Sequence, residues 1–67
     1  MSVASISEII ATSNTGFEDA VAQGIRRASQ TLRNIRSAWV KDHEVTVEDG
    51  RPALWKVTLK VTFVMED

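Results

Sequence analysis

Apolar and polar side chains alternate along the last part of the chain, from Ala53 to Met65. The apolar ones recur at every second position: Ala53, Trp55, Val57, Leu59, Val61, Phe63 and Met65. A period of two is typical of a β-strand with one buried face. At about 3.4 Å per residue this strand would extend about 44 Å, whereas a compact chain of this length is only about 28 Å across. We therefore expect the strand to overhang its own domain and to need cover from other copies of the chain.

The small size of the chain also favours assembly. It has 67 residues, no cysteine and a single histidine, His43. A core of this size rarely stabilises a fold by more than about 3 to 5 kcal/mol without disulfides, metals or partners. Disulfides are excluded, and so are the usual zinc clusters of cysteine and histidine. We expect a single domain spanning residues 1–67, stabilised by contacts between copies.

The formal net charge is −1, from 8 Lys and Arg residues and 9 Asp and Glu residues. It offers no overall attraction for nucleic acid. The arginines gather in the middle of the chain, which suits either contacts between subunits or a solvated helix face. No stretch approaches the roughly 20 apolar residues of a membrane span, and no charged leader precedes an apolar run. The expectation is a soluble cytoplasmic protein without nucleic-acid or membrane partners.

The first half of the chain predicts a strand followed by a helix. The segment Val3–Ala11 is rich in isoleucine and free of glycine and proline, and a Thr-Ser-Asn-Thr-Gly turn follows it. Thr15 and Glu18 have the spacing of a capping box, so a helix should begin near Gly16. Its buried stripe would run to Ile35 through Phe17, Ala20, Val21, Gly24, Ala28 and Leu32. The small residues of this stripe predict close packing of helix on sheet.

A second strand is predicted from Ala38 to Val47, followed by a hairpin turn at Asp49-Gly50. The fold class is then α+β, in the order strand, helix, strand, strand. If the turn has two residues, partners across the hairpin have numbers that sum to 99, unless a bulge at Gly50 shifts the register by one. The paired residues would be Trp39 with Lys60, Lys41 with Thr58, and His43 with Lys56. Their face would be free for partners or ligands, while Val40, Val57, Leu59, Val61 and Phe63 face the helix.

The sequence offers no catalytic constellation that we recognise. It lacks a glycine-rich phosphate loop and a serine, histidine and aspartate set. His43 stands between Asp42 and Glu44, but adjacent strand residues point to opposite faces, so neither carboxylate can orient the imidazole. An exposed or interface histidine is the better interpretation, and we expect the protein not to be an enzyme.

Three segments resemble the dodecin family: 8–13 before the helix, 27–35 at its end, and 57–63 in the last strand. The similarity covers nearly the whole chain. It implies a three-stranded antiparallel sheet partly wrapped around one helix. It also implies twelve subunits that close into a hollow shell, which would provide the cover that the long strand needs.

Many dodecins bind flavins, riboflavin or FMN, and are thought to store them. The family's flavin-stacking Trp falls here on Ser37, and its flavin-contacting Gln falls on Lys56, so the chain resembles the members that lack the stacking Trp. Trp39 lies on the same predicted face as Ser37, about 7 Å along the strand. It could stack on a flavin from this position or fill a seam between subunits. The resemblance implies flavin as the leading ligand, with Ser37, Trp39, Asp42 and Lys56 on the face that meets it.

Dodecin-like proteins without the flavin Trp have been associated with calcium. Calcium takes six to eight oxygen ligands, more than Glu48 and Asp49, or Asp42 and Glu44, of one chain can supply, although symmetry could gather several copies around an axis. An acidic turn that is simply exposed is the other interpretation of Glu48 and Asp49. The alternative function is thus a flavin-free shell that binds divalent cations or is purely structural.

Overall fold

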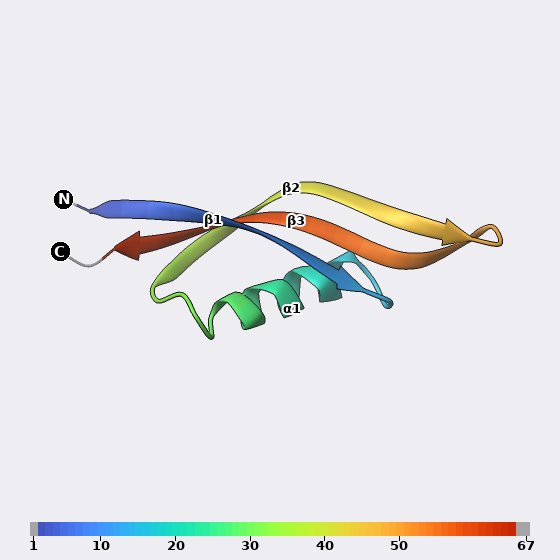
Figure 1. Cartoon of the computed structure of the whole chain (residues 1–67), viewed down its shortest axis with the longest axis horizontal. Coiled ribbons are helices and arrows are strands. Elements are labelled where there is room, and N and C mark those ends of the chain that lie inside the picture. Colours follow the sequence, from blue (N-terminus) through green and yellow to red (C-terminus); the bar gives the residue numbers. More distant parts are fainter. Residues whose placement is uncertain (1, 66–67) are drawn as a thin grey trace.

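The computed structural model describes residues 2–65 (Figure 1). Its elements follow the order strand, helix, strand, strand: β1 (Val3–Ser13), α1 (Phe17–Ala28), β2 (Ile35–Glu48) and β3 (Arg51–Met65). The three strands form one antiparallel sheet in the order β1-β3-β2. The helix α1 lies against one face of this sheet (Figure 1). The predicted α+β fold is confirmed.

The molecule is long and narrow, with extents of 52 × 19 × 13 Å. Its radius of gyration is 13.8 Å, compared with about 11 Å expected for a compact chain of this length. The hairpin of β2 and β3 continues beyond the N-terminal end of α1 as an arm, residues 46–54, which β1 does not reach (Figure 1). The predicted overhang is therefore present, and α1 covers only part of the sheet.

The core lies where α1 crosses β3. Ala20, Val57, Leu59 and Val61 have no exposed surface. Close packing at Gly24 brings the helix to this depth, because a Cβ atom there would lie 3.0 Å from both the Ala11 Cβ and the Leu59 Cδ1 atoms. The close packing of helix on sheet that was predicted from the small residues of α1 is therefore confirmed at Gly24.

The helix ends earlier than predicted, at Ala28 rather than near Ile35. The N–H groups of Gln30 and Thr31 bond three residues back, to the carbonyls of Arg27 and Ala28, so the last turn tightens. Asn34 then adopts a left-handed backbone with φ of 60°, which asparagine tolerates better than most residues. Leu32 and Ile35 still pack on the core, but from the connection and from β2. Their helical spacing was misleading because two different elements supply them.

The predicted capping box at the start of α1 is wrong. Gly16 occupies the N-cap position, and no side chain caps the helix there. The buried Ser13 hydroxyl organises the turn instead: its Oγ accepts the N–H of Thr15 at 3.0 Å and that of Gly16 at 3.4 Å. The same hydroxyl donates to the Asp19 carboxylate at 2.6 Å. Ser13 therefore joins the end of β1 to the first turn of α1.

Replacing Ser13 with alanine is expected to lower the free energy of unfolding by about 1 kcal/mol at neutral pH. Hydrogen bonds from Ser13, then Gln23 and Thr15, hold the pKa of Asp19 below its ordinary value of 3.8. Because the folded pKa is the lower one, this stabilisation is present above the ordinary value and is lost as pH falls through the folded pKa. Ser13→Ala should therefore lose less stability than the parent on acidification below about pH 4.

Urea titrations at several pH values, followed by circular dichroism, check this expectation. Asn14→Ala, at the exposed neighbouring position, is the control and should leave the pH dependence unchanged. Parallel pH curves for the parent and Ser13→Ala would contradict the role given to Ser13.

Between the turn and Trp39, two irregularities change the predicted register of the β2–β3 hairpin, and a third lies beyond Trp39, at the unpaired Arg36. At the turn, Asp49 and Gly50 both have positive φ, 53° and 73°, as a two-residue hairpin requires. Glu48 pairs with Arg51 as predicted. Ala53 then has no partner, which shifts the register by one, and the unpaired Lys41 shifts it back.

The predicted pair of Trp39 with Lys60 is therefore confirmed, because it lies beyond both irregularities. The pair of Lys41 with Thr58 is wrong, since Asp42 stands opposite Thr58. The pair of His43 with Lys56 is also wrong, and Glu44 stands opposite Lys56.

Candidate ligand-binding face

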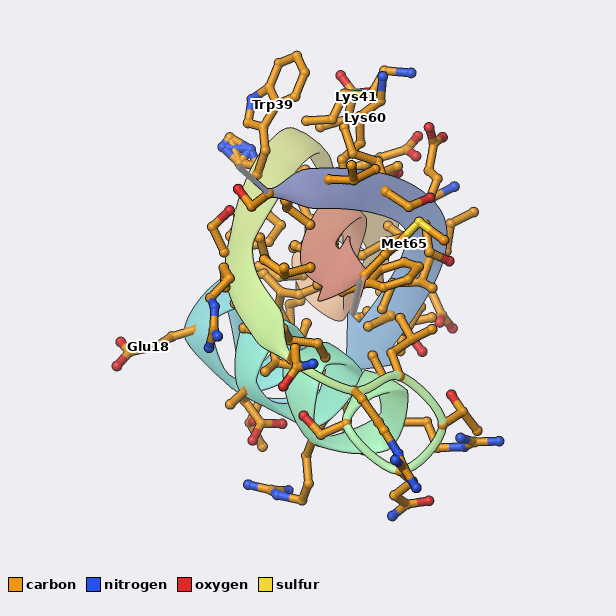
Figure 2. All side chains as sticks on the ribbon, turned by 90° about the vertical axis from the view of Figure 1, so that its left-hand side faces the viewer. Glu18, Trp39, Lys41, Lys60 and Met65 are labelled. Carbon is orange, nitrogen blue, oxygen red and sulfur yellow. The ribbon has the colours of Figure 1, made fainter. Side chains whose placement is uncertain are left out.

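The sheet face turned away from α1, here called the outer face, carries the side chains with recognition chemistry. Alternation along β3 places its even-numbered residues opposite the buried Val57, Leu59 and Val61. Figure 2 shows Trp39, Lys41 and Lys60 projecting from the side of the sheet opposite α1. Cross-strand partners share a face, so the register gives the set: Ile6, Glu8, Ile10 and Thr12 of β1, Ser37, Trp39, Asp42 and Glu44 of β2, and Lys56, Thr58, Lys60 and Thr62 of β3.

Trp39 is the most prominent aromatic group of the outer face, with 61% of its surface exposed. The Nζ atom of Lys60, its cross-strand partner, lies over the indole ring at 5.3 Å from the centroid. A cation over an indole face is attracted to the ring electrons. The pair combines a flat apolar surface with a positive charge.

Two salt bridges occupy other charged groups of this face. The Lys41 Nζ atom lies 3.9 Å from the Glu8 carboxylate, across the central strand. The Lys56 Nζ atom lies 3.3 Å from the Glu44 carboxylate. All four side chains remain substantially exposed, so each pair contributes little to stability, about 0 to 1 kcal/mol. The contact of Lys41 with Glu8 depends on the register shift at the unpaired Lys41. Because of this shift, the consecutive residues Lys41 and Asp42 both lie on the outer face.

A shallow hollow of about 380 Å³ lies beside Lys56 along the arm, lined by Asp42, His43, Glu44, Lys56 and Thr58. The pair of Trp39 and Lys60 is next to that of Asp42 and Thr58 along the outer face, and Ser37, opposite Thr62, follows it. The structure therefore places all four predicted ligand residues, Ser37, Trp39, Asp42 and Lys56, on one face, as two neighbouring pairs.

His43 does not belong to the outer face, contrary to the sequence prediction. The register shift places it opposite Val57, on the side of the helix. Its ring contacts Phe17 of α1, with centroids 4.9 Å apart. The imidazole thus packs at the edge of the core, where the overhanging arm leaves the helix.

The acidic pair Glu48 and Asp49 lies at the tip of the arm, far along the hairpin from Trp39, and both residues are exposed. Within residues 2–65, no three His, Asp or Glu side chains lie close enough together to hold a metal ion.

Sequence reasoning omitted Lys60, Glu8 and Lys41 from the candidate site. The signal for Lys60 was available, because the predicted register already placed it opposite Trp39. The Glu8–Lys41 contact had no such signal, since it joins two edge strands across a third.

A groove of about 510 Å³ between β1 and α1 was not predicted either. Ile9, Gly24 and Arg27 are among its lining residues. It follows from the exposed edge of β1 and the close approach of the helix.

Among the described residues, no helix has the length and apolarity needed to cross a membrane.

Comparison with known proteins gives consistent matches over the whole chain. The family model for Dodecin matches residues 3–66. A curated relative, calcium dodecin from Mycobacterium tuberculosis, is 34% identical over 97% of this chain and 92% of its own length.

Solved structures agree with this match. Dodecin from Streptomyces davaonensis superposes with a TM-score of 0.92 at 36% identity, over 98% of this chain and 97% of that chain. The calcium dodecin of Mycobacterium tuberculosis, described as calcium chelating and as having a novel calcium-binding site, superposes with a TM-score of 0.82 at 31% identity. That match covers 96% of this chain and 91% of the other.

Proposed function

The chain belongs to the dodecin family, and on that premise we propose that it forms a homododecameric shell that binds and stores a small ligand without turnover, in the cytoplasm. The observation that carries the proposal is the uncovered outer face. Ile6 and Ile10 of β1 are 60% and 63% exposed, and Trp39 of β2, across the central strand, is 61% exposed on the same face. A patch of large apolar side chains on a small chain is typical of an interaction surface. Cover by further copies would stabilise the overhanging arm.

Calcium is the first candidate ligand in this proposal. It is supported by the calcium dodecin of Mycobacterium tuberculosis, the curated relative at 34% identity. Glu48 and Asp49 are the carboxylates that we assign to it, because Glu8 and Glu44 are already within ion-pair distance of lysines. Calcium needs six to eight oxygens, so arm tips from several copies would have to meet around one ion.

Calorimetric titration of calcium into the metal-free protein is expected to give saturable heat. The double variant Glu48→Gln/Asp49→Asn should lose this heat, because amide oxygens are neutral and attract the cation less. Glu18→Gln is the matched control: Glu18 is an exposed carboxylate on α1 (Figure 2), and its replacement should leave binding unchanged. Absence of heat in the parent protein would remove calcium as the ligand, and unchanged heat in the double variant would remove the arm tip as its site.

Flavin is the second candidate, favoured by the exposed indole of Trp39. Flavin is the leading ligand expected from the sequence, and the calcium dodecin relative supports calcium ahead of it. Trp39 would stack on the isoalloxazine ring, and Lys56 would face a polar group of the cofactor. A lysine ammonium only donates hydrogen bonds, so it cannot accept one from the flavin imide as glutamine can. Ser37 would lie beside the ring without stacking on it.

Riboflavin and FMN titrated into the metal-free protein should each show saturable quenching of flavin fluorescence. Trp39→Ala should abolish the quenching while light scattering still reports the assembled mass. Trp55→Phe is the control, because Trp55 lies on the helix side of β3, opposite Val45. Quenching that survives in Trp39→Ala would exclude stacking on Trp39. Loss of assembly in that variant would instead assign Trp39 to a seam between subunits.

A further inference from the structure

We propose that Trp39 and Lys60 form a site for a planar aromatic ligand that carries an anionic group, and that Lys60 selects for the negative charge. The proposal extends the aromatic-ligand candidate above by naming the charge of the ligand, and it is independent of calcium. It stands on the position of Lys60 over the ring, on the distribution of salt bridges, and on the side chains beside the pair.

The face of Trp39 is available for stacking but already has a neighbour. The indole is 61% exposed, and the Lys60 Nζ atom lies over it at 5.3 Å from the ring centroid. A flat ligand that stacks on this face must displace the ammonium group from the ring. A neutral ligand would end the cation–π contact and offer no replacement charge.

Within residues 2–65, Lys60 takes part in neither salt bridge of the outer face. Glu8 stands opposite Lys60 on the side of β1. Its carboxylate lies within ion-pair distance of Lys41. The displaced ammonium would therefore meet a phosphate, sulfonate or carboxylate of the ligand without first breaking a salt bridge.

The neighbouring cross-strand pair adds hydrogen-bonding groups. Ser37 stands opposite Thr62, one step of the ladder from Trp39 and Lys60 on the same face, about 7 Å along the strands. Hydroxyl groups both donate and accept, so they fit the polar edge of a heteroaromatic ring or a phosphate oxygen. Indole, ammonium and hydroxyls together define the ligand as aromatic at one end and anionic at the other.

Calorimetric titrations of 1-naphthyl phosphate and 1-naphthol test this site, because the two probes share a ring and differ in charge. The parent protein should bind the phosphate at least about fivefold more tightly at low salt, and added salt should reduce the difference. Lys60→Gln should remove the preference by weakening binding of the phosphate and, because no ammonium then covers the indole, by strengthening binding of naphthol. Trp39→Ala should weaken both probes.

Arg26→Gln is the matched control, because Arg26 is an exposed cation of α1, on the other side of the sheet, and its replacement should keep the preference. Equal binding of the two probes by the parent would overturn the proposal, as would an unchanged preference in Lys60→Gln. No binding of either probe would overturn it too. Binding of naphthyl phosphate without binding of FMN or riboflavin would uphold the site and reject flavin as its occupant.

Discussion

Leu59→Ala is expected to lower the free energy of unfolding by about 2 to 5 kcal/mol and to leave the chain largely unfolded. Leu59 is fully buried and is one of the largest side chains at the crossing of α1 and β3. Gly24 of the helix lies directly over it, so the backbone cannot easily collapse into the cavity that alanine leaves. The loss equals most of what a core of this size supplies, about 3 to 5 kcal/mol.

Urea denaturation followed by circular dichroism measures this effect. Val47→Ala is the control, because it also removes aliphatic carbons but from a side chain that is 64% exposed on the arm. We expect Val47→Ala to keep the fold and to unfold cooperatively in urea. A Leu59→Ala protein that unfolds at the parental urea concentration would show that the described core does not carry the stability.

The double variant Ile6→Asp/Ile10→Asp is expected to convert the assembly to monomers or dimers. Both side chains point from β1 to the outer face and are exposed in the single chain. If another copy covers them, the variant places two carboxylates in an apolar contact, and burial of an unpaired charge is strongly unfavourable. The effect on the fold of one chain should be small, because neither residue belongs to the buried core.

Light scattering gives the mass directly, and the parent should have about twelve times the mass of one chain under the dodecamer proposal. Ala22→Asp/Gln30→Asp is the control, since it adds the same charge at exposed positions of α1 and of the connection after it. The large exposed apolar side chains of the described residues all lie on strands, so this control should stay assembled. A monomeric parent, or a double Ile variant of parental mass, would contradict cover of the outer face by other copies.

The candidate site could be predicted from the sequence only where the strand register was predicted correctly. Trp39 and Lys60 were placed opposite each other from the turn alone, because two irregularities on opposite strands cancel before that pair. His43 and Lys56 lie between the irregularities, and both of their predicted partners were wrong. A β-bulge has no strong local signature, since it depends on how the strands twist against the helix. The face of His43 therefore could not be read from the sequence.

The start of α1 gives a second example. Thr15 and Glu18 have the spacing of a capping box, yet Ser13 accepts the N–H bonds of the turn and donates to Asp19. Several hydroxyl side chains in this turn could accept its N–H groups. Which of them does so depends on the direction in which the chain leaves β1. The sequence contains the groups, and the packing of the strand against the helix selects one of them.

The sequence alone determined the order of the elements, the long last strand, the Asp49-Gly50 turn and the close contact at Gly24, because side-chain periodicity and backbone preference act over a few residues. The tertiary structure decided where the helix ends and where the strands slip. It also decided which charges pair across the sheet, because these depend on contacts between residues far apart in the chain. Glu8 and Lys41 meet across β3, which lies between their strands. Within residues 2–65, Lys60 lies over Trp39 and belongs to neither salt bridge of the outer face.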